Sequence, residues 1–172
     1  MERHEILHTL AEVATAFAGF TGIVVVLGRR SIGEWRSAEK IIVSVLLASS
    51  LGVVLFAFVP DLGSAAQLSP STTWRVSTFL FASYHSVVIL ASLVGIKRAL
   101  ASGEALPIPK PLLLPVFTAG FSLIASQYLT AMGLLGAWLF FFYLLGMLWL
   151  LCIATLSFTV LLLEAVSSKP AA

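Results

Sequence analysis

Long apolar stretches, separated by short polar ones, dominate the pattern of hydrophobic and polar positions along the chain. A helix needs roughly 20 mostly apolar residues to cross the hydrocarbon core of a bilayer. The pattern therefore predicts an all-α transmembrane helical bundle with five spans, at residues 6–28, 41–59, 76–96, 112–132 and 137–163. Four spans are the alternative, if the first stretch lies in the membrane interface instead of crossing the bilayer.

Glycine and proline mark the boundaries between the predicted spans. Pro60 is expected to end the second span, and segment 99–115, which contains four prolines, is expected to be a stiff extended connector. The apolar run over residues 112–163 would extend roughly 78 Å as one helix, more than twice the hydrocarbon thickness. We therefore expect a tight turn at Gly133 and Gly136 to divide it into two spans.

Composition excludes the soluble classes of protein. Of the 172 residues, 59% are hydrophobic and 10% are charged, and the mean hydropathy is +1.04. A soluble domain has roughly 45–50% apolar and about 25% charged residues, so this chain needs lipid around it. The net charge of +2 is too small to indicate nucleic-acid binding. We expect a single transmembrane domain over residues 1–172, with the lipid bilayer as a partner, no nucleic acid and no cofactor.

The basic residues are distributed unevenly over the predicted loops. Eight of the ten Lys and Arg residues fall in the first and third loops and in the C-terminal tail, whereas Arg3 and Arg75 fall on the opposite side. Cytoplasmic loops of membrane proteins retain Lys and Arg. The N-terminus is therefore expected outside and the C-terminus in the cytoplasm, which an odd number of spans requires.

The first span also carries a family resemblance. Residues 11–24 (AEVATAFAGFTGIV), followed by 27–30 (LGRR), resemble the start of a group of small, uncharacterised bacterial multi-pass membrane proteins. The resemblance covers about a fifth of the chain. It implies a location in the bacterial inner membrane, and it carries no established activity with it.

One face of the first span combines polar and small residues. Residues at spacings of three and four share a helix face, and here these are His8, Glu12, Thr15, Gly19 and Gly22. In a homo-oligomer, a ring of Glu12 side chains would form a cation-selective constriction, with His8 and Thr15 beside it. The alternative is close packing of neighbouring helices through the small residues Ala14, Ala18, Gly19 and Gly22.

Two other spans carry polar residues that are candidate partners of Glu12. His85 lies in the third span and Gln127 in the fourth. The expected topology places the three residues in the same half of the membrane, so they can form one cluster. Such a cluster would relay protons or bind a cation. Ordinary interhelical hydrogen bonding is the alternative.

The N-terminus contains a short pattern that is typical of zinc sites. His4-Glu5-Ile6-Leu7-His8 matches H-E-x-x-H, in which two His one helical turn apart bind zinc and the Glu acts as general base. Asp61 is a candidate third ligand, because the end of the second span is expected on the same side of the membrane. The alternative is that these are solvated residues at a chain end.

These patterns lead to three functional hypotheses. The first is a small homo-oligomeric channel for cations or protons, with Glu12 as the selectivity residue. The second is a non-catalytic scaffold or accessory subunit, whose protein partner binds the proline-rich or basic cytoplasmic loops. The third is a zinc-dependent membrane hydrolase built on His4, His8 and Asp61; apart from it, we expect no enzyme.

Overall fold

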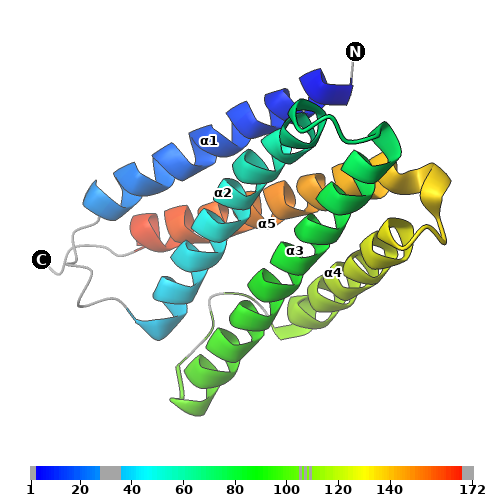
Figure 1. Ribbon diagram of the computed structural model, residues 1–172. Helices are drawn as coiled ribbons and strands as arrows, with labels where there is room; N and C mark the ends of the chain where they lie inside the picture. The colour runs from blue at the N-terminus through cyan, green and yellow to red at the C-terminus, as the bar shows by residue number, and fades with distance from the viewer. Residues whose placement is uncertain (1–2, 28–35, 105, 107, 109, 168–172) are drawn as a thin grey trace, which may run out of the picture.

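The computed structural model describes residues 3–27, 36–104, 106, 108 and 110–167, and within them every regular element is helical (Figure 1). The elements are α1 (Arg3–Leu27), α2 (Ser37–Ala65), α3 (Pro70–Ala101), α4 (Lys110–Ala131), the short 3-10 helix η2 (Gly136–Trp138) and α5 (Leu139–Ser167). Within the described residues, five helices are long and apolar enough to cross a membrane. The prediction of an all-α bundle with five spans is confirmed, and the structure supports a multi-pass membrane protein.

The orientation of the bundle in the membrane stays a prediction. Figure 1 shows the beginning of α1 and the end of α5 at opposite ends of the bundle, as an odd number of spans requires. Three of the basic residues behind the expected orientation, Arg29, Arg30 and Lys169, lie outside the described residues.

Helix α5 is at the centre of the bundle. It packs against α1, α2, α3 and α4, and each helix also packs against its neighbour in the chain. Figure 1 shows α1 and α4 on opposite sides of this arrangement. Buried side chains from α1, α2, α3 and α5 form one cluster, which includes Leu7, Phe56, Phe81, Tyr143, Met147 and Leu150.

Helix α2 continues past Pro60, so the predicted end of the second span at this residue is wrong. Proline has no N–H, and inside a helix it leaves the carbonyl four residues earlier without a donor. That carbonyl belongs to Phe56, and the hydroxyl of Tyr143 in α5 donates a hydrogen bond to it. Because an unpaired carbonyl in a bilayer core costs several kcal/mol, this contact from a distant helix allows α2 to reach Asp61 and beyond.

The predicted proline-rich connector is also shorter than expected. Helix α3 extends to Ala101 and α4 begins at Lys110, so residues 99–101 and 110–115 of this segment are helical. Pro111 lies in the first turn of α4, where a missing N–H removes no helical hydrogen bond. Pro115 lies inside α4, and the prediction of an extended structure there is wrong.

The turn between α4 and α5 lies where the sequence predicts it. Gly133 has a φ of +92°, a left-handed conformation that glycine adopts without steric cost. The amide of Leu134 donates a hydrogen bond to the carbonyl of Leu129 at 3.0 Å, which closes the end of α4. Gly136 then begins η2. The turn brings α5 back through the bundle antiparallel to α4.

Candidate functional site

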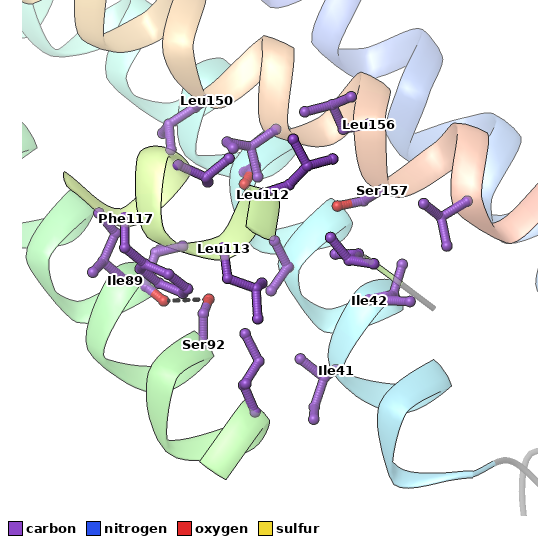
Figure 2. A pocket seen from close by; sticks show the side chains of 18 of the residues that line it. Ile41, Ile42, Ile89, Ser92, Leu112, Leu113, Phe117, Leu150, Leu156 and Ser157 are labelled. Carbon is purple, nitrogen blue, oxygen red and sulfur yellow. Dashed lines mark hydrogen bonds between the residues drawn. The ribbon is translucent and has the colours of Figure 1, made fainter. Parts of the chain in front are cut away.

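A cavity of about 360 Å³ lies between α2, α3, α4 and α5. This volume falls within the range of roughly 300–1,000 Å³ that is typical of small-molecule sites. Figure 2 shows aliphatic and aromatic side chains from all four helices around it, among them Ile42, Ile89, Leu113, Phe117 and Leu156. No Asp, Glu, Lys or Arg is among the lining residues that the structure describes. The cavity therefore suits an uncharged ligand that is mostly apolar.

The cavity extends from one end of the bundle to the middle of the spans. On α3 its lining runs from Ile96 to His85, which corresponds to about 16 Å along the helix. On α2 it runs over a similar length, from Ala38 to Ser49. The hydroxyl of Tyr84 donates a hydrogen bond to the carbonyl of Ala48 at 2.6 Å. This contact places Ser49 and His85 at the same level, which is the deep end of the cavity.

His85, at the deep end, has a partner for only one of its ring nitrogens. Its Nδ1 lies 3.5 Å from Oε1 of Gln127, while the Nε2 of the same amide donates to the carbonyl of Phe142 at 3.3 Å. An amide oxygen can only accept a hydrogen bond, so Nδ1 carries the proton and Nε2 of the neutral ring is an acceptor. His85 is fully buried, and its Nε2 has no partner in the described residues.

Gly146 on α5 makes room for the amide of Gln127. A β-carbon at this position would lie 2.0 Å from Nε2 of Gln127, which is far inside van der Waals contact. The absence of a side chain at residue 146 therefore lets the amide approach the backbone of α5 and contact the Phe142 carbonyl. The orientation of the amide, and with it the protonated nitrogen of His85, depends on this glycine.

Ser49 is the second polar residue at the deep end that lacks a partner. Many serine and threonine hydroxyls in these helices donate to a carbonyl one turn earlier, as those of Thr78, Ser86 and Ser92 do. The hydroxyl of Ser49 is fully buried and contacts no such acceptor in the part of the chain that the structure describes. An unpaired buried hydroxyl costs about 1–3 kcal/mol. Two polar atoms at one end of an apolar cavity thus lack hydrogen bonds.

A hydrogen-bonded contact lies at the other end of the cavity. Oε2 of Glu104 accepts a hydrogen bond from the amide of Ala38, the second residue of α2, at 3.0 Å. This bond, followed by hydrogen bonds from Ser37 and the charge of Arg36, holds the pKa of the Glu104 carboxyl below its usual range. Glu104 lies close in sequence to Leu106, which lines the cavity. The contact ties the chain after α3 to the beginning of α2.

The structure brings together two of the three residues of the predicted cluster of Glu12, Gln127 and His85. His85 and Gln127 are fully buried and contact each other. Glu12 is exposed on α1, which packs mainly against α2 and α5, and it does not join them. The sequence pattern also missed Ser49. A serine in an apolar run is ordinary in a membrane helix, and only the packing of four helices reveals that its hydroxyl has no partner.

The small and polar face predicted on α1 divides into two parts. Ala14 is buried in the core, so this small residue packs within the chain, and Ala18 is half-buried. Glu12, Thr15, Gly19 and Gly22 are exposed. A β-carbon at Gly19 or Gly22 would meet no atom within 4 Å. This part of the face therefore makes no close helix contact within one chain.

His4, His8 and Asp61 come together, as the sequence predicts. Nδ1 of His4 lies 2.5 Å from Oδ1 of Asp61, and Nε2 of His8 lies 2.9 Å from Oδ2. Each ring contacts a different carboxylate oxygen, and the described residues hold no group of three or more His, Cys, Asp or Glu arranged to hold a metal ion. The zinc site stays a prediction. What the three residues do here is join the beginning of α1 to the end of α2.

Comparison with protein-family models, with curated proteins and with solved structures found no match. The resemblance of the first span to small bacterial inner-membrane proteins therefore stays a prediction. Function is inferred from the chemistry of the cavity and of the exposed α1 face.

Proposed function

We propose that this multi-pass membrane protein binds a small, mostly apolar molecule in the cavity between α2, α3, α4 and α5. The observation that carries the proposal is the pair of buried, unpartnered polar atoms, Nε2 of His85 and Oγ of Ser49, on an otherwise apolar lining. Ligand sites typically combine apolar walls with a few polar groups that fix orientation. A ligand that supplies the missing hydrogen bonds removes the cost of leaving both atoms unpaired.

Trp149 lines the cavity and provides a direct test of binding. We expect 12-bromododecan-1-ol, added to the protein in lipid nanodiscs, to quench the fluorescence of Trp149 in a saturable manner. The variant Trp149→Phe should lose this saturable component, because the other tryptophans that the structure describes, Trp74 and Trp138, do not line the cavity.

A larger side chain inside the cavity should abolish binding. Val45 lines the cavity, so Val45→Phe should remove the saturable quenching. Val87 is 64% exposed on α3, and Val87→Phe is a matched control that should leave the quenching unchanged. Quenching that rises linearly and equally in the wild type and both variants would mean simple partition into lipid and would contradict the proposal.

The exposed face of α1 favours a second function, a small homo-oligomeric channel for cations or protons. An ionisable side chain within a membrane span is costly and usually faces a neighbour or water. Glu12 is exposed on the single chain, together with Thr15 and two glycines that make no close contact. Association of several chains through this face would place the Glu12 carboxylates around a shared axis, in the predicted inner membrane.

Flux measurements in liposomes test the channel. Glu12→Gln removes the charge from the face and should abolish cation flux, whereas Glu5→Gln, the same change in the first turn of α1, should preserve it. Flux that is absent in the wild type, or unchanged in Glu12→Gln, would contradict the channel. The scaffold and the zinc hydrolase stay predictions; copurification of a stable protein partner would support the first, and stoichiometric zinc that His4→Ala removes would support the second.

A further inference from the structure

The hydrogen-bonding character of the deep end of the cavity restricts the molecule that fits there. Resting on the proposed binding function, we infer that the ligand is a neutral amphiphile with one apolar tail and a hydroxyl group. This hydroxyl donates a hydrogen bond to Nε2 of His85 and accepts one from the hydroxyl of Ser49.

The requirement for a donor follows from the two contacts of Gln127. Reversing its amide would put two oxygens, Oε1 of Gln127 and the carbonyl of Phe142, at hydrogen-bond distance with no proton between them. The observed orientation avoids this clash and directs Oε1 at Nδ1 of His85. With the proton held at Nδ1, Nε2 offers only a lone pair. A carbonyl or an ether on the ligand leaves this nitrogen unpaired, and a hydroxyl satisfies it.

A hydroxyl also matches Ser49, at the same level of the cavity. A hydroxyl group has one donor and two acceptor sites, and the side chain of Ser49 can rotate its proton toward the ligand. A hydroxyl thus has the donor and the acceptor that the two unpartnered atoms of the protein require. The lining residues that the structure describes include no charged side chain. A carboxylate, a phosphate or an ammonium group would be desolvated there without a counter-charge, which is unfavourable.

The remainder of the cavity accommodates an alkyl or aryl tail. From His85 the lining continues for about 16 Å toward Ile96 on α3. Leu113 and Phe117 of α4 lie across from Ile41 and Ile42 of α2 in Figure 2. A volume of about 360 Å³ suits one chain of moderate length. Long-chain alcohols and alkylphenols have the required chemistry.

The test compares 12-bromododecan-1-ol with its methyl ether, which accepts hydrogen bonds but cannot donate one. Quenching of Trp149 in nanodiscs gives the affinity of each, expressed as its mole fraction in the bilayer so that partition into lipid cancels. We expect the alcohol to bind about tenfold more tightly, the effect of one hydrogen bond to an otherwise unpaired buried atom. In His85→Leu the difference should fall below about twofold.

Ser49→Ala separates the two hydrogen bonds and keeps the test valid if His85→Leu fails to fold. Both the alcohol and the ether accept a hydrogen bond from Ser49, so this variant should weaken both by about threefold and preserve the preference for the alcohol. Saturable binding of alcohol and ether with equal affinity would overturn the hydroxyl assignment and leave the cavity as an apolar binding site. The absence of saturable quenching by either compound would overturn the proposed function itself.

Discussion

Two of the places in this bundle where a buried polar atom lacks its usual partner have different outcomes: at one, another helix supplies a partner, and at the other the described residues supply none. At Pro60 the carbonyl of Phe56 loses its helical donor, and the hydroxyl of Tyr143 replaces it. At the deep end of the cavity, Nε2 of His85 and Oγ of Ser49 remain without a donor or an acceptor in the described residues. The first place is closed by tightly packed side chains, whereas the second borders about 360 Å³ of open space.

The difference between the two places indicates that the polar contact at the first contributes to stability, whereas the polar atoms at the second are available for binding. The hydroxyls of Ser50 and Thr73 are also buried without a partner in the described residues, but neither residue lines the cavity. Unpaired buried atoms are rare in native proteins and require an explanation. The location of His85 and Ser49 on the wall of a cavity points to a molecule from outside the chain as the partner of these two atoms.

Removing the hydroxyl at the first place should have the largest effect on stability. Tyr143→Phe leaves the carbonyl of Phe56 unpaired in a buried, lipid-surrounded position, and we expect the free energy of unfolding to fall by about 1–3 kcal/mol. Reversible unfolding of the protein in mixed micelles, followed by circular dichroism, measures this change. In Pro60→Ala, residue 60 again has an N–H, which can donate a hydrogen bond to the carbonyl of Phe56.

A double-mutant cycle makes this prediction specific to the hydrogen bond. In the Pro60→Ala background, Tyr143→Phe should lower the free energy of unfolding by less than about half as much as it does in the wild type. The reason is that the carbonyl of Phe56 then keeps its helical donor. Equal costs in both backgrounds would show that the tyrosine contributes by packing alone.

The corresponding change at the second place should have the opposite sign. Ser49→Ala removes a hydroxyl that has no partner, so the unfolding free energy of the ligand-free protein should remain unchanged or rise by up to about 1 kcal/mol. Ser92 also lines the cavity, but its hydroxyl donates to the carbonyl of Val88 at 2.7 Å. Ser92→Ala is the matched control and should lower the unfolding free energy slightly. A clear loss of stability in Ser49→Ala would mean that its hydroxyl is already satisfied.

The smallest effect is expected from Glu104, where the cavity meets the end of the bundle. Its hydrogen bond to the amide of Ala38 holds the carboxyl pKa below its usual range. A lowered pKa in the folded state means that the contact stabilises the fold above the ordinary Glu pKa, and that this contribution disappears as the pH falls through the lowered value. Glu104→Gln should therefore unfold more easily than the wild type at neutral pH. The two unfolding midpoints should converge in acid, and a constant difference down to pH 3 (about one unit below the ordinary Glu value) would contradict the role of the charge.

The sequence predicts most of the fold, because span length and hydropathy depend only on local composition. The boundaries that it missed depend on residues far away in the chain. Pro60 indicates the end of a helix, unless Tyr143, which lies 87 residues after Phe56, supplies a donor to the Phe56 carbonyl. Similarly, Pro111 indicates an extended connector unless it lies in the first turn of a helix, where proline is tolerated.

The candidate site was predictable only through its titratable and amide side chains. His85 and Gln127 are conspicuous within apolar spans, and the structure places them in contact. The pairing of His4 and His8 with Asp61 also follows from the spacing of the two histidines and the expected topology. The cavity and the unpaired hydroxyl of Ser49 have no counterpart in a linear pattern. Both arise from how the side chains of α2, α3, α4 and α5 fill the space between them.

The central position of α5 has a consequence for the order in which the bundle is assembled during synthesis. Helices leave the ribosome in sequence, so α1 to α4 can enter the bilayer before α5 is complete. Until α5 arrives, the carbonyl of Phe56 has no donor, and Gln127 has no Phe142 carbonyl to orient its amide. Before that point, the main helix contacts available to the first four helices are those between neighbours in the chain. Insertion of the last helix, α5, completes the packed core and encloses the cavity in the same step.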